Sequence, residues 1–351
     1  MRTLEWTPDG LVLLDQTRLP GETVFLSIST VDELVDAITR LAVRGAPALG
    51  VVGAFGVVVA IDQAAREHWD EAALTAALER IRACRPTATN LAWGVDQVRP
   101  YLPEGREAVL ARAEQIRAQD ESANRELSRH AVDWLLARAS VHQSRTGGDH
   151  TGTTPRRPFR VLTHCNAGAL AASAWGTGLG VVRELAARDL LELVYVDETR
   201  PLLQGSRLTA YECAVEGWPH VVQVDGAAAG TIVGGQVDVA VIGADRIARN
   251  GDVANKIGSV GVALACADAG IPLIVAAPWA TVDLATARGE DIAIEERSET
   301  EVAGFAGVRV IPDESRCRNP AFDVTPARLV SAIATERGVI EPDGSTDLST
   351  L

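Results

Sequence analysis

The 351-residue sequence predicts an α/β protein, with a small N-terminal domain of short strands and helices before a doubly wound, mostly parallel Rossmann-like sheet. Residues 1–28 alternate apolar and polar side chains between Pro and Gly breaks, which is typical of short antiparallel strands. From about residue 30 to 142, apolar residues recur with the helical period. Beyond residue 158, short runs of Val, Ile and Leu alternate with helix-like segments, which favours a parallel sheet with right-handed crossovers.

The helical region opens with a capping signal. Thr30 is placed as an N-cap, and Glu33 follows three residues later, which is the spacing of a capping box. Three segments carry the helical period and are predicted helices: 30–43, 69–84 and 107–139.

The segment "GAPALGVVGAFGVVVAIDQAA", residues 45–65, has to be weighed as a membrane span. It is nearly uncharged for about 17 residues, which is the short limit for crossing a bilayer. Near its start it contains four glycines: Gly45, Gly50, Gly53 and Gly56. Because glycines allow helices to approach closely, we interpret the segment as a buried helix and expect no membrane contact.

The second domain is predicted from apolar runs that lack a polar face, as expected for strands covered on both sides. The five runs are residues 159–164, 191–198, 237–244, 271–278 and 308–312. Residues 143–158, "QSRTGGDHTGTTPRRP", are polar and rich in Gly, Thr and Pro, so we predict a linker or loop there. The predicted domains are therefore a β/helical domain at 1–142 and an α/β catalytic domain at 159–351.

The composition limits the function classes. A formal net charge of −14 argues against a general nucleic-acid binder, because such proteins concentrate Lys and Arg. Five widely spread cysteines without a C-x-x-C pair indicate neither a disulfide framework nor a zinc site. The N-terminus "MRTLEWTPDG" lacks the apolar core of a signal peptide. We therefore expect a cytoplasmic protein that binds no metal and contacts neither nucleic acid nor membrane.

Polar residues follow three of the predicted strands, at the carboxyl ends where parallel sheets bind ligands. Cys165 lies just after the first run, Asp197 and Glu198 end the second, and Asp245 follows the third. We expect these groups to converge on one face of the sheet.

Cys165 has a simpler interpretation as a small buried hydrophobe. Its position at a strand end, before a predicted helix start, instead favours an exposed sulfur with a lowered pKa. Neighbouring residues of a strand point to opposite faces, so His164 is predicted to be a structural histidine and not the partner of this thiol.

Asp245 follows an apolar run and a glycine. Burying a carboxylate there is costly unless it is paired or protonated. The alternative interpretation is an ion pair, for example with Arg246. A thiol and a carboxyl group in one pocket suit proton transfer at two positions of a substrate.

Groups that suit an anion lie in both predicted domains. In "RGAPALG", Arg44 precedes the backbone N–H groups of Gly45 and Ala46 at a predicted helix start, a combination that suits a phosphate. Further candidates for phosphate or hydroxyl binding are Arg85, Gln204, Asn255 and Lys256. For any one of them a solvated position is the simpler interpretation, and the prediction depends on the set. The sequence has no GxGxxG or Walker A pattern, so no dinucleotide or nucleoside triphosphate is expected.

Six motifs resemble the methylthioribose-1-phosphate isomerase family: "RGAPALG", "RPTATNL", "THCNAGALA", "VYVDETRPLLQGSRLTAYE", "GADRIARNGDVANKIGS" and "NPAFDVTP". The resemblance runs from about residue 13 to residue 340. These enzymes convert 5-methylthioribose 1-phosphate to 5-methylthioribulose 1-phosphate in methionine salvage. The segment 143–158 is longer and more polar than the family pattern.

The resemblance implies roles for the candidate residues. It implies that Cys165 and Asp245 are catalytic, with Asp245 as a proton donor. It implies substrate contacts at seven positions: Arg44, Gly45, Ala46, Arg85, Gln204, Asn255 and Lys256. It also implies a sugar-phosphate substrate, no metal or other cofactor, and a homodimer formed through the α/β domain.

A chemistry follows from these implied roles. The anomeric phosphate locks the sugar as a ring, so a protonated Asp245 would donate to the ring oxygen as C1 opens. Hydrogen then moves from C2 to C1. In one route Cys165, as a thiolate, takes the C2 proton and returns it through an enolate-type intermediate. In the other a hydride shifts directly, and Cys165 and Asp245 move only hydroxyl protons. The sequence leaves both routes open.

Three rival interpretations remain. An isomerase of 5-deoxyribose 1-phosphate or ribose 1,5-bisphosphate would differ in the pocket around C5. A regulatory subunit of the initiation-factor exchange complex shares part of these motifs, but it would need neither Cys165 nor Asp245. A cysteine hydrolase is disfavoured, because no histidine is placed to activate the thiol.

Overall fold

The computed structural model describes residues 2–85, 89–145, 157–343 and 345–350. The chain divides into two compact units. Unit 1 comprises Met1–Asn124 and Ala167–Gly176, and unit 2 comprises Arg125–Asn166 and Thr177–Leu351. The unit boundary falls inside α5 (Arg106–Arg145), a continuous helix in which composition shows no break. Of the predicted linker, 146–156 lie outside the described residues. The boundaries 1–142 and 159–351 follow composition and stay a prediction.

Residues 167–176 belong to unit 1 because hydrogen bonds hold them there. Thr3 Oγ1 donates to the Ala169 carbonyl at 2.5 Å, and Gln16 Nε2 donates to the Leu170 carbonyl at 2.7 Å. The Ser173 backbone N–H donates to Asp120 Oδ2 at 2.8 Å. No local pattern in the sequence indicates such an excursion, since these partners are 53 to 166 residues away.

The antiparallel strands predicted for residues 1–28 are confirmed. Over the described part of unit 1 they form a three-stranded sheet of β1 (Leu4–Thr7), β2 (Gly10–Leu14) and β3 (Phe25–Ile28). Leu11 and Leu13 are fully buried while Val12 between them is partly exposed, as expected for a sheet with one core face.

The predicted capping box is also confirmed. The Thr30 hydroxyl accepts a hydrogen bond from the Glu33 backbone N–H at 3.2 Å, and Glu33 Oε2 accepts from the Thr30 backbone N–H at 3.0 Å. This pair starts α1 (Val31–Thr39). The other helical elements that begin in unit 1 before residue 125 are α2 (Ala46–Glu67), α3 (Glu71–Ala83), α4 (Thr89–Val98), η1 (Arg99–Glu104) and α5.

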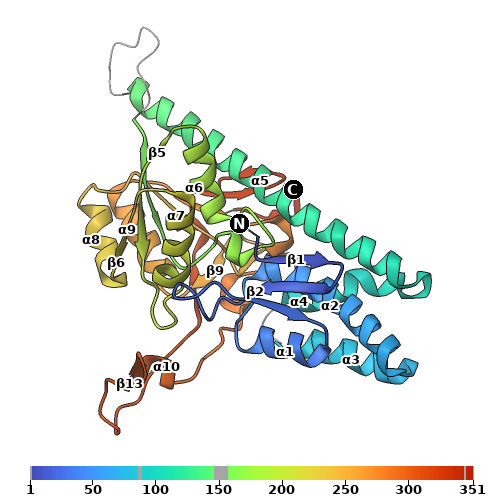
Figure 1. Cartoon of the computed structure of the whole chain (residues 1–351). Helices are drawn as coiled ribbons and strands as arrows, with labels where there is room; N and C mark the ends of the chain where they lie inside the picture. The colour runs from blue at the N-terminus through green and yellow to red at the C-terminus, as the bar shows by residue number, and fades with distance from the viewer. Residues whose placement is uncertain (1, 86–88, 146–156, 344, 351) are drawn as a thin grey trace. The chain divides into compact units, whose positions relative to one another are not determined.

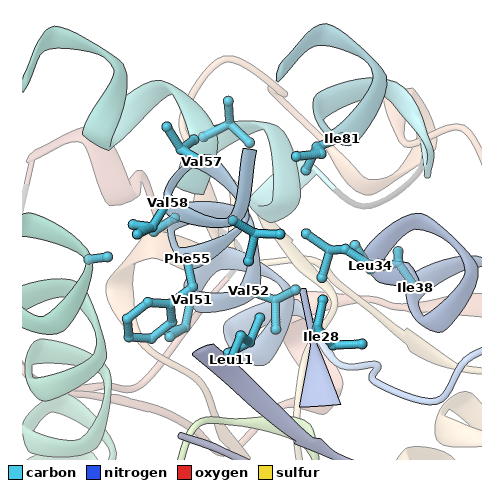
Figure 2. Close-up of a cluster of buried hydrophobic side chains, with 14 of the residues drawn as sticks. Leu11, Ile28, Leu34, Ile38, Val51, Val52, Phe55, Val57, Val58 and Ile81 are labelled. Atoms are coloured by element: carbon cyan, nitrogen blue, oxygen red, sulfur yellow. The ribbon is translucent and has the colours of Figure 1, made fainter. Parts of the chain in front are cut away.

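Helix α2 is long and apolar enough to cross a membrane, but it is the core helix of unit 1. Its Phe55 and Val58 are fully buried, and the surrounding side chains come from β2, β3, α1 and α3 (Figure 2). The glycines pack it closely against α4, because a Cβ on Gly53 or on Gly94 would collide with backbone of the other helix. The interpretation of residues 45–65 as a buried helix is therefore confirmed.

Unit 2 is built on a sheet that, over the described residues, has seven strands in the order β16-β15-β10-β7-β4-β5-β6. Its strands are β4 (Phe159–Thr163), β5 (Leu191–Asp197), β6 (His220–Gln223), β7 (Val239–Ile242), β10 (Leu273–Ala276), β15 (Ala332–Thr335) and β16 (Gly338–Ile340). All neighbours pair in parallel except β15 with β16. The predicted doubly wound, mostly parallel sheet is confirmed.

Helices cover both faces of this sheet. Val161 of β4 packs with the C-terminal half of α5 and with α6 (Gly178–Ala187), whereas its neighbour Leu162 packs on the other face with α8 (Ala228–Val233) and α9 (Ser259–Ala269). This explains why the strands have no polar face. The remaining elements up to α9 are η2 (Ala169–Ala171, in unit 1), η3 (Gly205–Thr209), α7 (Ala210–Glu216) and η4 (Asp225–Ala227).

A smaller sheet of unit 2 has the order β11-β8-β9-β14. Its strands are β8 (Arg246–Ala248), β9 (Val253–Lys256), β11 (Val282–Asp283) and β14 (Phe322–Thr325). The other elements of this region are η5 (Trp279–Thr281), η6 (Gly289–Asp291), α10 (Thr300–Ala303), β12 (Gly304–Phe305), β13 (Val308–Arg309), η7 (Ala327–Leu329) and η8 (Leu348–Thr350).

The run at 308–312 contains a strand, β13, but the prediction that it belongs to the buried parallel sheet is wrong. Within it, β13 pairs only with β12 in an antiparallel hairpin, and this hairpin and α10 project from the rest of unit 2 (Figure 1). Val308 and Val310 are 63% and 58% exposed, so the apolar run is not a core strand. Apolar residues alone do not distinguish a buried run from an exposed one.

Candidate active site

Cys165 and Asp245 follow neighbouring strands at the point where the chain order of the sheet reverses. β4 pairs with β7 in parallel, β5 and β6 extend the sheet on one side, and β10 and β15 extend it on the other. Such a reversal leaves a crevice beyond the carboxyl ends of the two central strands, where doubly wound proteins bind their ligands. Of the predicted site residues, the fold thus places Cys165 and Asp245 on either side of the expected binding position.

The backbone at Cys165 is in a conformation that few non-glycine residues adopt, with φ of 65°. The Cys165 N–H donates to Thr199 Oγ1 at 2.8 Å, and its carbonyl accepts from Thr209 Oγ1 at 2.7 Å. Thr199 itself has φ of 64°. Two hydroxyl groups from different segments therefore hold the backbone of this strained turn on both sides of the Cys165 side chain.

The helix predicted to begin directly after Cys165 is absent: residues 166–177, all described, contain only the three-residue η2. Helix α6 starts at Gly178, after the segment that folds into unit 1. The argument that a helix N-terminus lowers the pKa of the thiol is therefore wrong. Cys165 is half-buried, as Cys84 and Cys317 are, whereas burial raises the pKa of Cys213 and of Cys266 to about 12.

Residues around the turn form a buried polar network. Asn166 Nδ2 donates to Thr209 Oγ1 at 3.1 Å and to the carboxylate of buried Glu212 at 2.9 Å. These partners come from η3, a π-helical segment that is uncommon outside functional sites, and from α7. A side chain at Gly205 would collide with the Asp197 carbonyl, so a glycine is needed where η3 meets the end of β5.

Gln204 immediately precedes this segment and is 8% exposed. Its amide oxygen has no hydrogen-bond partner within the described part of the chain. Buried polar atoms are nearly always hydrogen-bonded, so this oxygen suits a ligand hydroxyl.

Asp245 lies at the junction of the two sheets of unit 2. Its backbone N–H donates to the Ala254 carbonyl of β9 at 2.9 Å, which places it beside Asn255 on the neighbouring strand. Arg246 pairs with Asp283, the two side chains being 3.5 Å apart. The Asp245 side chain is half-buried.

Asn255 and Lys256 are held at the end of β9. Asn255 is 5% exposed, and its Nδ2 donates to Ser259 Oγ at 2.8 Å. Lys256 Nζ donates to the Ala321 carbonyl at 2.9 Å and lies 4.6 Å from the centre of the Phe322 ring. The ammonium group is thereby positioned on the β14 side of the small sheet.

His164 is buried at 2% exposure, as expected for a structural histidine. Its Nδ1 lies 3.0 Å from Asp197 Oδ2, and its Nε2 lies 2.8 Å from the Ile257 carbonyl oxygen. Burial lowers the pKa of His164, but the hydrogen bond to Asp197 and its charge outweigh burial, so the pKa lies above its ordinary value.

His164, Asp197 and Asp225 are the only cluster among the described residues whose ligand atoms lie close enough to share a metal ion. Both ring nitrogens of His164 already face protein acceptors, and the Asp225 carboxylate accepts from the Thr199 and Arg200 backbone N–H groups at 2.7 Å. A metal ligand needs a free lone pair on the histidine. We therefore assign this cluster to structure.

Unit 1 carries the other predicted binding residues. Arg44 Nε donates to Gln16 Oε1 at 3.1 Å, and Gly45, with φ of 94°, is the N-cap before Ala46, the first residue of α2. This helix start has no side-chain cap hydrogen bond. Arg85 is half-buried just after α3, and 86–88 of its motif lie outside the described residues.

The sequence predicts Asp197 on the same face of the sheet as Cys165, but it does not indicate that the hydroxyl groups of Thr199 and Thr209 support this residue. Thr199 and Asp197 lie in "VYVDETRP" and Thr209 lies in "LLQGSRLT", two stretches already singled out for other residues. Their contacts join residues 34 to 44 positions apart, which no local pattern indicates.

The chain matches the model of the initiation factor 2 subunit family over residues 42–342. It is 49% identical over 339 residues to a probable bifunctional methylthioribose-1-phosphate isomerase/methylthioribulose-1-phosphate dehydratase of Nocardia farcinica, covering 96% of this chain and 59% of that relative. The chain thus spans less than two thirds of that protein. It is 46% identical to a methylthioribose-1-phosphate isomerase of Anaeromyxobacter sp. (strain K), covering 98% of this chain and 94% of the relative.

Two solved structures are similar over nearly the whole chain. The 5-methylthioribose 1-phosphate isomerase of Pyrococcus horikoshii OT3 has a TM-score of 0.85 at 35% identity, covering 97% of this chain and 92% of that one. The translation initiation factor eIF-2B subunit delta of A. fulgidus has a TM-score of 0.84 at 35% identity, covering 100% and 98%. The fold is therefore common to proteins named as enzymes and as translation factors.

Proposed function

The chain belongs to the initiation factor 2 subunit family, and we propose that it is an aldose–ketose isomerase converting 5-methylthioribose 1-phosphate to 5-methylthioribulose 1-phosphate in methionine salvage. The observation that carries the proposal is the placement of Cys165 and Asp245 beyond β4 and β7, the neighbouring strands at the reversal of the sheet. The relatives that the chain matches over almost their full length carry this enzyme name.

The two residues divide the proton transfers. Asp245, when protonated, donates to the ring oxygen of the sugar, and C1 opens while its phosphate is retained. Cys165, held by the hydroxyl groups of Thr199 and Thr209, faces the reacting carbons. As a thiolate it removes the C2 proton and returns it to C1, or it moves only hydroxyl protons while a hydride shifts from C2 to C1. Either route balances with no external oxidant or reductant.

The remaining candidates are assigned to substrate binding. In unit 2 the buried amide oxygen of Gln204 accepts from a sugar hydroxyl, and Asn255 and Lys256 bind hydroxyl or phosphate oxygens. In unit 1 the proposed phosphate contacts are Arg44, Gly45, Ala46 and Arg85. The proposed protein works without a metal or other cofactor, in the cytoplasm, as a homodimer that contacts neither nucleic acid nor membrane.

A regulatory role is the second candidate, because the family name and the A. fulgidus structure both refer to initiation factors. A regulatory subunit would need a binding pocket, but it would not need a thiol on a strained turn. Holding Cys165 at φ of 65° costs free energy, and such strain is often found at catalytic sites. This observation favours catalysis.

Proton NMR of purified protein with 5-methylthioribose 1-phosphate, without added metal, tests the proposal. We expect the ketose to appear with wild type and with Cys317→Ser, the control at another half-buried thiol, and to be lost with Cys165→Ser. If wild type leaves this substrate unchanged, 5-deoxyribose 1-phosphate and ribose 1,5-bisphosphate are tested next. Failure with all three substrates would favour the regulatory role. In heavy water, deuterium at C1 of the product would exclude a pure hydride shift.

A further inference from the structure

We propose that His164 is a positioning residue of the isomerisation: its ring, protonated on both nitrogens, ties the turn that carries Cys165 to the ends of β5 and β9. The inference rests on the proposed function, because it gives a purpose to the placement of the thiol. His164 is not a candidate proton carrier for the substrate, since the ring is buried and both of its nitrogens face protein acceptors.

The hydrogen bonds of His164 determine its protonation. The Ile257 carbonyl oxygen, 2.8 Å from Nε2, only accepts, so Nε2 carries a hydrogen. Nδ1 lies 3.0 Å from Asp197 Oδ2, and Asp197 Oδ1 accepts from Gln223 Nε2 at 2.8 Å. Burial lowers the pKa of His164, but the hydrogen bond to Asp197 and its charge outweigh burial and keep that pKa above its ordinary value. Nδ1 therefore also donates. A neutral imidazole has a single N–H, so donation from both nitrogens corresponds to the imidazolium form.

The surroundings confine the ring. Gly258 has φ of 110°, and a Cβ there would lie 2.7 Å from His164 Cε1, so a glycine is needed for the ring to fit. Three carboxyl groups face it from different elements: Asp197 from β5, Asp225 from η4 and Asp323 from β14. All three attract a positive charge, although burial raises the pKa of Asp323 and reduces its share.

The two hydrogen bonds of the His164 ring matter because they join a well-supported strand, β9, to the less supported turn at Cys165. β9, with Asn255 and Lys256, is held by pairing to β8 and to β14 without His164. The Cys165 turn has an unfavourable φ and follows the last residue of β4 by two positions. Loss of the His164 bonds would therefore release the thiol and leave the substrate-binding side chains in place. Rate should fall more than binding, because misplacing a reacting group affects mainly the transition state.

Steady-state kinetics of His164→Gln and His164→Asn test whether the rate falls more than substrate binding. Glutamine keeps a donor for the Ile257 carbonyl, asparagine keeps one for Asp197, and neither restores both bonds or the charge. We expect kcat to fall about 10- to 100-fold in both, with KM within about threefold of wild type. His130→Gln is the matched control, since His130 Nδ1 makes a 2.8 Å contact with a carbonyl oxygen of Thr335 away from this turn. It should keep wild-type kcat.

Two further measurements do not depend on turnover. The rate at which iodoacetamide alkylates Cys165, followed on its tryptic peptide by mass spectrometry from pH 6 to 10, should change more than about threefold in the His164 variants and not in His130→Gln. Nitrogen-15 NMR of histidine-labelled wild type should show one of the six histidines as an imidazolium at pH 7.5, and that signal should be missing in His164→Asn.

The outcomes separate the two proposals. If wild type isomerises none of the three sugar phosphates, the function proposal fails, while alkylation and the NMR spectrum still report on His164. The inference is overturned if the variants keep wild-type kcat with only a lower melting temperature. It is also overturned if Cys165 alkylation is unchanged, or if His164 is neutral at pH 7.5. Should both variants fail to fold, the wild-type spectrum alone decides the protonation on which the tether depends.

Discussion

The backbone N–H of Cys165 donates to the hydroxyl oxygen of Thr199 at 2.8 Å, and both residues have a positive φ, 65° and 64°. Such backbone conformations cost about 1–3 kcal/mol each and persist only where the surroundings hold them. Here the hydrogen bond joins two strained residues, so each one helps to hold the other. The Thr199 hydroxyl also donates to the Asp197 carbonyl oxygen at 2.9 Å. The thiol therefore stands on a turn whose geometry is set before a substrate arrives.

Replacing Thr199 tests this support. Thr199→Val keeps the shape of the side chain and removes its hydroxyl, so the Cys165 N–H loses its acceptor. We expect kcat to fall about 10- to 100-fold, because a misplaced reacting group loses transition-state stabilisation. Thr199→Ser restores the hydroxyl and should recover kcat to within about threefold. Wild-type kcat in the valine variant would show that the turn needs no such support.

Asp245→Asn removes the proposed proton donor and keeps the size of the side chain. We expect a loss of about 10²- to 10⁴-fold in kcat, the usual contribution of a general acid, with a melting temperature near that of wild type. Asp268→Asn, at an exposed position on α9, is the control for the lost charge. An Asp245→Asn enzyme with more than about a tenth of wild-type kcat would remove Asp245 from the mechanism.

Gly45 and Gly105 form a matched pair in unit 1, since both have φ of 94°. A Cβ on Gly45 would lie 2.6 Å from Ala171 Cα, whereas one on Gly105 meets nothing within 4 Å. Both alanine variants incur the backbone strain, and only Gly45→Ala adds the collision, so we expect it to be the less stable of the two by about 1–3 kcal/mol. Guanidinium unfolding of the two proteins measures the difference, and equal stabilities would contradict it.

Asp238 gives a prediction about acid stability. Burial raises the pKa of its carboxyl group, but hydrogen bonds from Arg160 and the charges of Arg160 and Arg157 outweigh burial and hold the pKa below its ordinary value. A carboxyl group of this kind stabilises the fold above its unfolded pKa and loses that effect as pH falls through the lower folded pKa. Asp238→Asn should therefore cost about 1–3 kcal/mol at pH 7.

The cost of Asp238→Asn should shrink below about pH 4, where the wild-type carboxylate also becomes protonated. Melting temperatures of both proteins from pH 7 to pH 3 measure this. Asp313→Asn, whose carboxylate is 89% exposed beside Arg309, is the control and should differ little from wild type at any pH. If the difference in melting temperature between wild type and Asp238→Asn stays constant with pH, the Asp238 charge does not contribute to stability.

Much of the fold could be predicted because it depends on local patterns. The Thr30–Glu33 capping box, the buried helix at 45–65 and four of the five predicted strands follow from residues close together in the chain. The prediction of a buried strand at 308–312 failed because a short apolar run has the same composition whether it is buried or exposed. The helix after Cys165 failed because residues 167–176 make their hydrogen bonds with distant parts of unit 1.

The sequence by itself determined where the two side chains proposed to be catalytic lie in the chain. The apolar runs and the polar residues that follow them are enough to place Cys165 and Asp245 at strand ends. The tertiary structure alone decided how the thiol is held, because its supports, Thr199, Thr209 and the His164 ring, act through hydrogen bonds between segments far apart in the chain. Local periodicity records which face of an element is apolar, whereas a contact between two loops depends on the packing of everything between them.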